Sequence, residues 1–180
     1  MKKLQSLISF ADAVVCRLSS YGWVAALLTR LFVGYFFFET GWAKVHSLDA
    51  FTMRFAQWGI PYPAFNAALS AYTECIGGAL TILGLATRFV SVAMIINMAV
   101  AVLSVKLKSV AGLNDFVELD EPLYALVYLW LMFYGAGGLS IDYLIRSALG
   151  LPADLEHPEN DRRAAASERE LMRAGSASLQ

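Results

Sequence analysis

The chain has 180 residues, of which 58% are hydrophobic and only 16% are charged. Soluble domains average roughly 45–50% apolar and about 25% charged residues, and disordered chains are less hydrophobic still. With a mean hydropathy of +0.54, the composition argues against both classes and favours a membrane protein. The charge balance is 14 basic against 15 acidic residues. Nucleic-acid binding is not expected, because it requires a basic excess.

Residues 1–20 carry apolar side chains at helical spacing, with charged and polar residues on the other side. This pattern predicts an amphipathic helix that lies in the membrane interface. A signal peptide is the competing interpretation, since Lys2 and Lys3 precede apolar residues and Ala11–Ala13 resembles a cleavage site. The apolar stretch is short and interrupted, which disfavours that alternative.

Four long apolar runs follow, at about 22–43, 66–86, 89–110 and 122–145. Each has roughly 20 residues or more, enough to cross a hydrocarbon core of about 30 Å as a helix. Only Thr87 and Arg88 separate the second run from the third, which predicts a tight antiparallel hairpin. The sequence therefore predicts an all-α fold, a bundle of four transmembrane helices.

The segment between the first two runs carries Leu48, Phe51, Phe55 and Trp58 at helical spacing and then breaks at residues 59–63. We expect a short interfacial helix followed by a rigid turn. Beyond Gly150 the composition becomes polar and charge-mixed, with a short helix expected over about 160–173. The predicted organisation is an interfacial helix at 1–20, a membrane domain at 21–147 and a polar cytoplasmic tail at 148–180.

Basic residues near the ends of the spans predict the orientation, because cytoplasmic loops are enriched in Lys and Arg. With both termini inside, the inner side carries Lys2, Lys3, Arg17, Arg88 and Arg146, against Lys44, Arg54, Lys106 and Lys108 outside. This small excess predicts N-in and C-in.

Polar residues lie within three of the runs. Arg30 is eight residues into the first and Glu74 eight residues into the second, so counting from opposite ends places them about 6 Å apart in depth. Asn97 in the third run reaches nearly the same level. We expect a buried polar cluster of Arg30, Glu74 and Asn97. Its role is either a structural ion pair or a site for protons or a redox ligand.

Small residues share faces with these charges. In the first run they are Gly34 and Gly41, and in the second Gly77, Gly78 and Gly84. Such residues let helix backbones approach closely, so we expect the two faces to pack together. Glu39 lies roughly opposite Arg30 on its helix, where it would face a lipid-side partner, the interface or a second chain.

In the fourth run, Tyr124, Tyr128 and Asp142 fall on one stripe. Tyrosines near the end of a span usually form an aromatic belt, and the alternative is a face on which a quinone stacks. No histidine pattern suits haem or a metal, so neither metal nor directly bound cofactor is expected apart from that quinone. Cys16 and Cys75 lie far apart and form no CxxC pair.

A series of short motifs recurs in a definite order between about Leu28 and Arg146. They are Arg30 with Gly34, residues 39–44 (ETGWAK), residues 59–63 (GIPYP), Glu74 with Gly77 and Gly78, residues 84–88 (GLATR), residues 119–124 (LDEPLY) and residues 135–142 (GAGGLSID). In this order they resemble the DoxX family of small bacterial membrane proteins. The resemblance implies a four-helix bundle in the bacterial plasma membrane. It also implies a link to membrane redox complexes, since the family takes its name from a subunit of a thiosulfate:quinone oxidoreductase. It assigns no catalytic residue.

Three functions remain open from the sequence. The first is a non-catalytic accessory subunit of a larger membrane complex, respiratory or redox, surrounded by lipid and by other subunits. The second is a quinone-reactive oxidoreductase subunit, in which the polar cluster and the tyrosines would bind the quinone. The third is a small-solute or proton carrier, for which no inverted repeat is evident.

Overall fold

The computed structural model describes residues 21–110 and 112–151. The predictions for the interfacial helix at 1–20 and for the polar tail beyond Leu151, with its short helix, lie outside the described residues. The chain divides into two compact units, residues 1–144 and 145–180. The hydrogen bonds, ion pairs and packing contacts of the polar residues described in the following paragraphs lie within residues 21–144, in the first unit.

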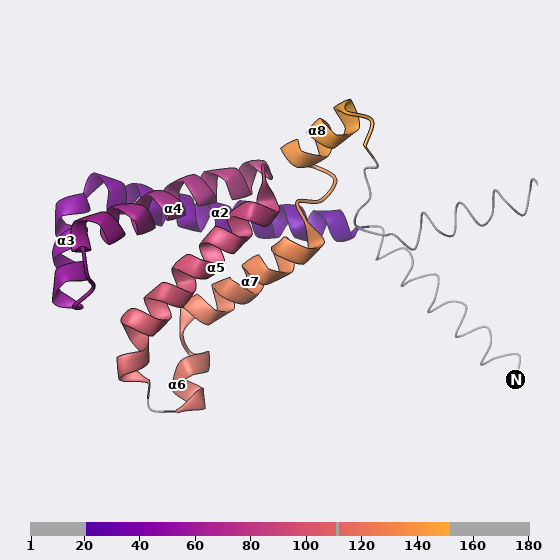
Figure 1. The fold of residues 1–180 in the computed structure, drawn as a ribbon. Helices are drawn as coiled ribbons and strands as arrows, with labels where there is room; N and C mark the ends of the chain where they lie inside the picture. Colours follow the sequence, from indigo (N-terminus) through magenta and orange to yellow (C-terminus); the bar gives the residue numbers. More distant parts are fainter. Residues whose placement is uncertain (1–20, 111, 152–180) are drawn as a thin grey trace, which may run out of the picture. The chain divides into compact units, whose positions relative to one another are not determined.

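The described residues form seven α-helices and one 3-10 helix, so this part of the chain is all-α, as predicted (Figure 1). In chain order they are α2 (Gly22–His46), α3 (Leu48–Gln57), α4 (Pro63–Leu83), α5 (Thr87–Ser104), η1 (Lys106–Ser109), α6 (Leu113–Val117), α7 (Asp120–Tyr134) and α8 (Ile141–Ala148).

The first three apolar runs correspond to α2, α4 and α5. By length and composition, α2 and α5 qualify as membrane spans among the described helices. Helix α4 has 21 residues and α7 has 15. A helix of that last length extends about 22 Å, less than the hydrocarbon core of roughly 30 Å.

The fourth apolar run is not one helix, and this part of the prediction is wrong. Helix α7 ends at Tyr134, and α8 begins only at Ile141. Between them Gly135 and Gly137 have φ values of +91° and +78°, which glycine adopts without the steric cost that a Cβ imposes. No charged residue interrupts the apolar run between Tyr134 and Ile141, so the length of the run alone does not reveal the break.

The hairpin between α4 and α5 is as tight as predicted, but its turn comes earlier. It consists of Gly84, Leu85 and Ala86, and Thr87 is already the first residue of α5. Gly84 and Ala86 both have left-handed conformations, with φ values of +63° and +50°.

Helix α3 matches the short helix expected after the first run. Its buried face consists of Phe51 and Phe55, which pack against Ala67 and Ala71 of α4. The turn that follows includes Gly59 with a φ of +77°, and α4 then begins at a proline. Proline at the first helical position costs no hydrogen bond, because that N–H has no partner within the helix.

Helices α2 and α4 lie side by side (Figure 1). A Cβ on Gly78 would meet the backbone of Phe38, and one on Gly41 would meet the backbone of Cys75. A Cβ on Gly34 would lie 3.0 Å from the carbonyl oxygen of Gly78. The glycines therefore allow the backbones to touch, as at helix pairs in membranes.

A compact core lies between α2, α5 and α7. Its buried members are Phe37, Val90, Met94, Met98, Tyr128 and Leu131. Large apolar side chains also cover the outside of the helices, including Phe32, Phe89 and Phe133, which are 75%, 82% and 73% exposed. A soluble monomer rarely exposes so much contiguous apolar surface, whereas lipid accommodates it.

Candidate functional site

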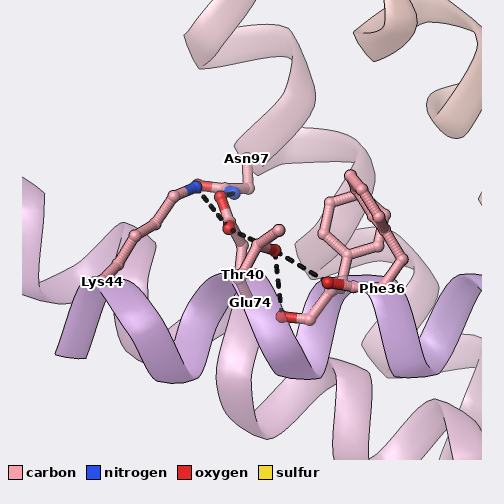
Figure 2. Close-up of polar contacts among 6 residues, drawn as sticks. Phe36, Thr40, Lys44, Glu74 and Asn97 are labelled. Atoms are coloured by element: carbon pink, nitrogen blue, oxygen red, sulfur yellow. Dashed lines mark hydrogen bonds and ion pairs between the residues drawn. The ribbon is translucent and has the colours of Figure 1, made fainter. Parts of the chain in front are cut away.

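A buried carboxylate, Glu74 of α4, is the centre of a polar cluster between three helices (Figure 2). Its Oε2 atom lies 2.5 Å from Lys44 Nζ, and Thr40 Oγ1 lies 3.5 Å from the same oxygen. On the other side, Asn97 Nδ2 of α5 donates to Oε1 over 3.1 Å. We refer to Thr40, Lys44, Glu74 and Asn97 as the Glu74 cluster.

Helix geometry explains why these side chains converge. Thr40 and Lys44 are four residues apart on α2 and so lie on one face, one turn above the other. Gly41 lies between them and packs directly on the backbone of Glu74 and Cys75. The close approach brings the carboxylate within reach of both α2 side chains, and Asn97 completes the cluster from α5.

Lys44 and Glu74 form a partly buried ion pair within the cluster. Both carboxylate oxygens accept a hydrogen bond, which is what a buried ion pair needs to offset desolvation. The Lys44 side chain is 32% exposed, and its ammonium also lies 5.2 Å from the ring centroid of Phe51. The lysine side chain is thus partly exposed at the surface of the helices, while the carboxylate is buried.

Arg30, which we expected in this cluster, lies elsewhere. It is 1% exposed, and its guanidinium donates to two main-chain carbonyls of the turn after α7, Ala136 through Nη1 and Leu139 through Nη2. A Cβ on Gly84 would clash with the same guanidinium. Arg30 therefore joins the turn after α7 to the turn between α4 and α5.

The predicted depth of Arg30 is wrong because α2 and α4 are shifted relative to each other along their axes. Gly34 already packs against Ile82, one residue before α4 ends, so Arg30 lies beyond the end of that helix. Gly41, which packs on Glu74, is eleven residues further along α2, or about 16 Å. The structure brings Glu74 and Asn97 together and separates Arg30 from them.

Asp142 has a structural role at the same end of the bundle as Arg30. Its carboxylate accepts the backbone N–H groups of Ala86 over 2.7 Å and Thr87 over 3.0 Å. Its own N–H donates to the Gly84 carbonyl over 3.0 Å. Because unsatisfied N–H groups and the helix dipole make a helix N-terminus positive, this carboxylate is a favourable cap for α5.

The stripe of Tyr124, Tyr128 and Asp142 does not form one ligand face. Tyr128 is fully buried against Phe37, and its hydroxyl lies beside Thr81 without an ordinary hydrogen bond to any described residue. Tyr124 is half-buried and stacks on Phe36, with ring centroids 5.0 Å apart. Asp142 caps α5 instead.

The predicted cluster did not include two of its members, Thr40 and Lys44, although Lys44 shares a helix face with Gly34 and Gly41 in the sequence. Their spacing of four residues around Gly41 was the available signal, since it places both on the face that packs against α4. Within residues 21–110 and 112–151, no group of three His, Cys, Asp or Glu side chains is placed to hold a metal ion.

The described part of the chain is all-helical, with two candidate membrane spans and an internally paired polar centre. Residues 25–107 match the DoxX family. The "Putative oxidoreductase CatD" of Bacillus subtilis (strain 168) is 36% identical over 86 residues, covering 48% of this chain and 63% of CatD. The uncharacterized membrane protein Rv3486 of Mycobacterium tuberculosis (strain ATCC 25618 / H37Rv) is 35% identical over 86 residues, 47% of this chain and 53% of its own length.

An uncharacterized protein of Haemophilus influenzae (strain ATCC 51907 / DSM 11121 / KW20 / Rd) is 29% identical over 136 residues, covering 73% of this chain and 90% of that protein. No solved structure matches the chain. Residues 25–107 of the chain are thus similar to the DoxX family, and the chain is homologous to CatD and Rv3486. It spans less than two thirds of the length of either relative. All four residues of the Glu74 cluster, and Arg30, lie within the matched segment.

Proposed function

We propose that this protein is a non-catalytic subunit of a redox complex in the bacterial plasma membrane. One observation carries the proposal: the buried charges serve the bundle itself. Glu74 is held by Lys44 and Asn97, Arg30 binds main-chain carbonyls, and Asp142 caps α5. What the helices present outward is mainly apolar surface, which suits lipid and neighbouring subunits.

The redox assignment is supported by the DoxX match of residues 25–107 and by the printed name of a relative, "Putative oxidoreductase CatD". A bound cofactor in a neighbouring subunit would supply the electron transfer. In this arrangement the chain anchors and orients that subunit in the bilayer.

As a finer part of the proposal, α4 and α7 cross the membrane together with α2 and α5. The outward side chains of both helices support this. On α4, Phe65, Leu69 and Ile76 are exposed, and on α7, Leu123, Leu126 and Phe133 are exposed. The short α7 would be accommodated by local thinning of the bilayer, which costs little per ångström of mismatch.

The basic residues favour cytoplasmic termini, with the α4–α5 turn on the same side. Single cysteines at Arg88 and Arg54 would test this orientation by labelling of intact cells with a membrane-impermeant maleimide. The cysteine at position 54 should react in intact cells, and the one at position 88 only after lysis. The reverse pattern would contradict the orientation.

Purification from the source membrane in mild detergent tests the subunit role. Mass spectrometry and a visible spectrum should be taken from the same chromatographic peak. Companions in fixed stoichiometry, with flavin or haem absorbance assigned to them, are expected. A lone, colourless protein with full native stability would contradict the proposal.

A second candidate is direct quinone contact, and the Tyr124–Phe36 stack favours it. Phe36 is 40% exposed, so this pair of flat rings borders the outer surface of the helices, where a lipid-soluble quinone diffuses. Quinone titration of the purified protein would show quenching of intrinsic fluorescence that is lost in Phe36→Leu and retained in Phe89→Leu. Equal quenching in both variants would remove this candidate.

A further inference from the structure

Glu39 is an acidic residue on the outer face of a candidate membrane span. It lies seven residues before His46, the end of α2, which is about 10 Å along the helix. It is exposed, and none of the hydrogen bonds and ion pairs among the described residues involves its carboxylate. Glu74, by contrast, is buried and held on both oxygens.

The neighbours of Glu39 on this face are aromatic. Phe32, Tyr35, Phe36 and Trp42 are spaced around it by three, four or seven residues, and all are exposed. This surface, Phe32 to Trp42 with Glu39 near one end, is referred to as the Glu39 face. It lies opposite the packed face of α2, whose buried members include Gly34, Phe37 and Gly41.

An acid within the hydrocarbon depth is unfavourable against lipid alone, and such residues usually pair with another polar group. A carboxylate makes its strongest hydrogen bonds with Arg or Lys. From this complementarity we propose that the Glu39 face binds a transmembrane helix of a different protein, which carries an Arg or Lys at the depth of Glu39. The proposal rests on the subunit role proposed above and gives the chemistry of the partner.

A second copy of this chain fits the face less well. A two-fold contact centred on this face would place the same surface against itself and bring two Glu39 carboxylates together. Two carboxylates side by side repel each other. No described cation lies on the exposed face of α2 between Leu31 and Trp42 to compensate for this repulsion. A heterologous partner with a cation avoids this repulsion.

The test compares E39Q and E39K with the wild-type chain in the complex purified in mild detergent. E39Q keeps the size of the side chain and removes its charge, and E39K reverses the charge. The matched control is E118K, which makes the same reversal at an exposed acid outside the long helices. Thermal unfolding of each purified variant shows whether it is folded as stably as the wild-type chain. We expect retention of the partner to fall about 30-fold or more in E39K, and less in E39Q, on the scale of a desolvated charge pair.

The partner's cation is then identified by photo-crosslinking from a benzophenone side chain at position 35. The crosslinked peptide should belong to an apolar segment of another protein that contains Arg or Lys. Changing that residue to Glu should restore binding to E39K and weaken binding to the wild type.

The outcomes separate the two proposals. A wild-type chain that purifies without companions overturns the subunit role. Companions that remain bound at wild-type levels to E39Q and E39K overturn the Glu39 inference alone. A crosslink to a second copy of this chain, or to lipid only, also overturns it.

Discussion

The ammonium of Lys44 lies 2.5 Å from the Glu74 carboxylate and joins α2 to α4 (Figure 2). Asn97 extends the contact to α5 from the other carboxylate oxygen. Three helices are thus fixed in register by one buried acid, at the level where Gly41 brings the backbones of α2 and α4 together.

Removing either member of the Lys44–Glu74 pair should destabilise the bundle. We expect Lys44→Met and Glu74→Leu each to cost about 1–3 kcal/mol, less than the roughly 3–5 kcal/mol of a fully buried pair, since Lys44 is partly exposed. The double variant should lose less than the sum of the two. Unfolding in detergent micelles measures the free energies of unfolding of the wild type, the two single variants and the double variant. Lys106→Met is the control, because its ion pair with Glu121 is longer, at 3.4 Å, and more exposed.

Arg30 and Glu74 should behave independently. They are separated by about 16 Å along α2, and distant sites add to within about 0.5 kcal/mol. Arg30→Leu should be severely destabilising, since it leaves the Ala136 and Leu139 carbonyls without their guanidinium donor. A double-mutant cycle of Arg30→Leu with Glu74→Leu measures the coupling. A coupling energy above about 1 kcal/mol would contradict this independence and support the direct Arg30–Glu74 pairing expected from the sequence.

Asp142 should stabilise the start of α5. Asp142→Ala removes the acceptor for two backbone N–H groups, and caps of this kind contribute about 0.5–2 kcal/mol. Hydrogen exchange at Ala86 and Thr87 should accelerate, while exchange in α3 stays unchanged. Asp142→Asn should give a smaller effect because one oxygen remains. Unchanged protection at both amides would contradict the capping role.

The contact between α2 and α4 should not tolerate a single methyl group at its centre. In Gly78→Ala the new Cβ would meet the backbone of Phe38, which cannot rotate away. Overpacking of this kind costs about 1–3 kcal/mol or more. Gly138→Ala is the matched control, since a Cβ there meets nothing within 4 Å. Melting temperatures that fall equally in both variants would argue against backbone contact.

The sequence predicted the helices well where their signals are local. Helical spacing located α3, and the length of the apolar runs located α2, α4 and α5 to within a few residues, apart from the C-terminal end of α5. Gly34, Gly41 and Gly78 indicated the close contact between α2 and α4, because small residues at helical spacing are typical of the interfaces between membrane helices. Gly77, which was expected on the same face, packs against Met94 of α5 instead.

The errors concern information that is not local. The end of α7 depends on a turn that closes over Arg30, and glycines in an apolar run do not by themselves predict a break. The position of Arg30 depends on how far α2 slides past α4. Counting depth from the predicted ends assumes that all spans start at the same plane, and α2 extends beyond α4 at the Arg30 end.

In the proposed subunit role, the Glu74 cluster holds the helices together and takes no part in a reaction. The most direct measurement is the rate of quinone reduction by the purified complex, assembled with either wild-type chain or Glu74→Gln, normalised to assembled complex. We expect equal rates per complex, together with lower thermal stability for Glu74→Gln. A rate reduced ten-fold or more in a fully assembled, stable complex would contradict it and make Glu74 part of the reaction site.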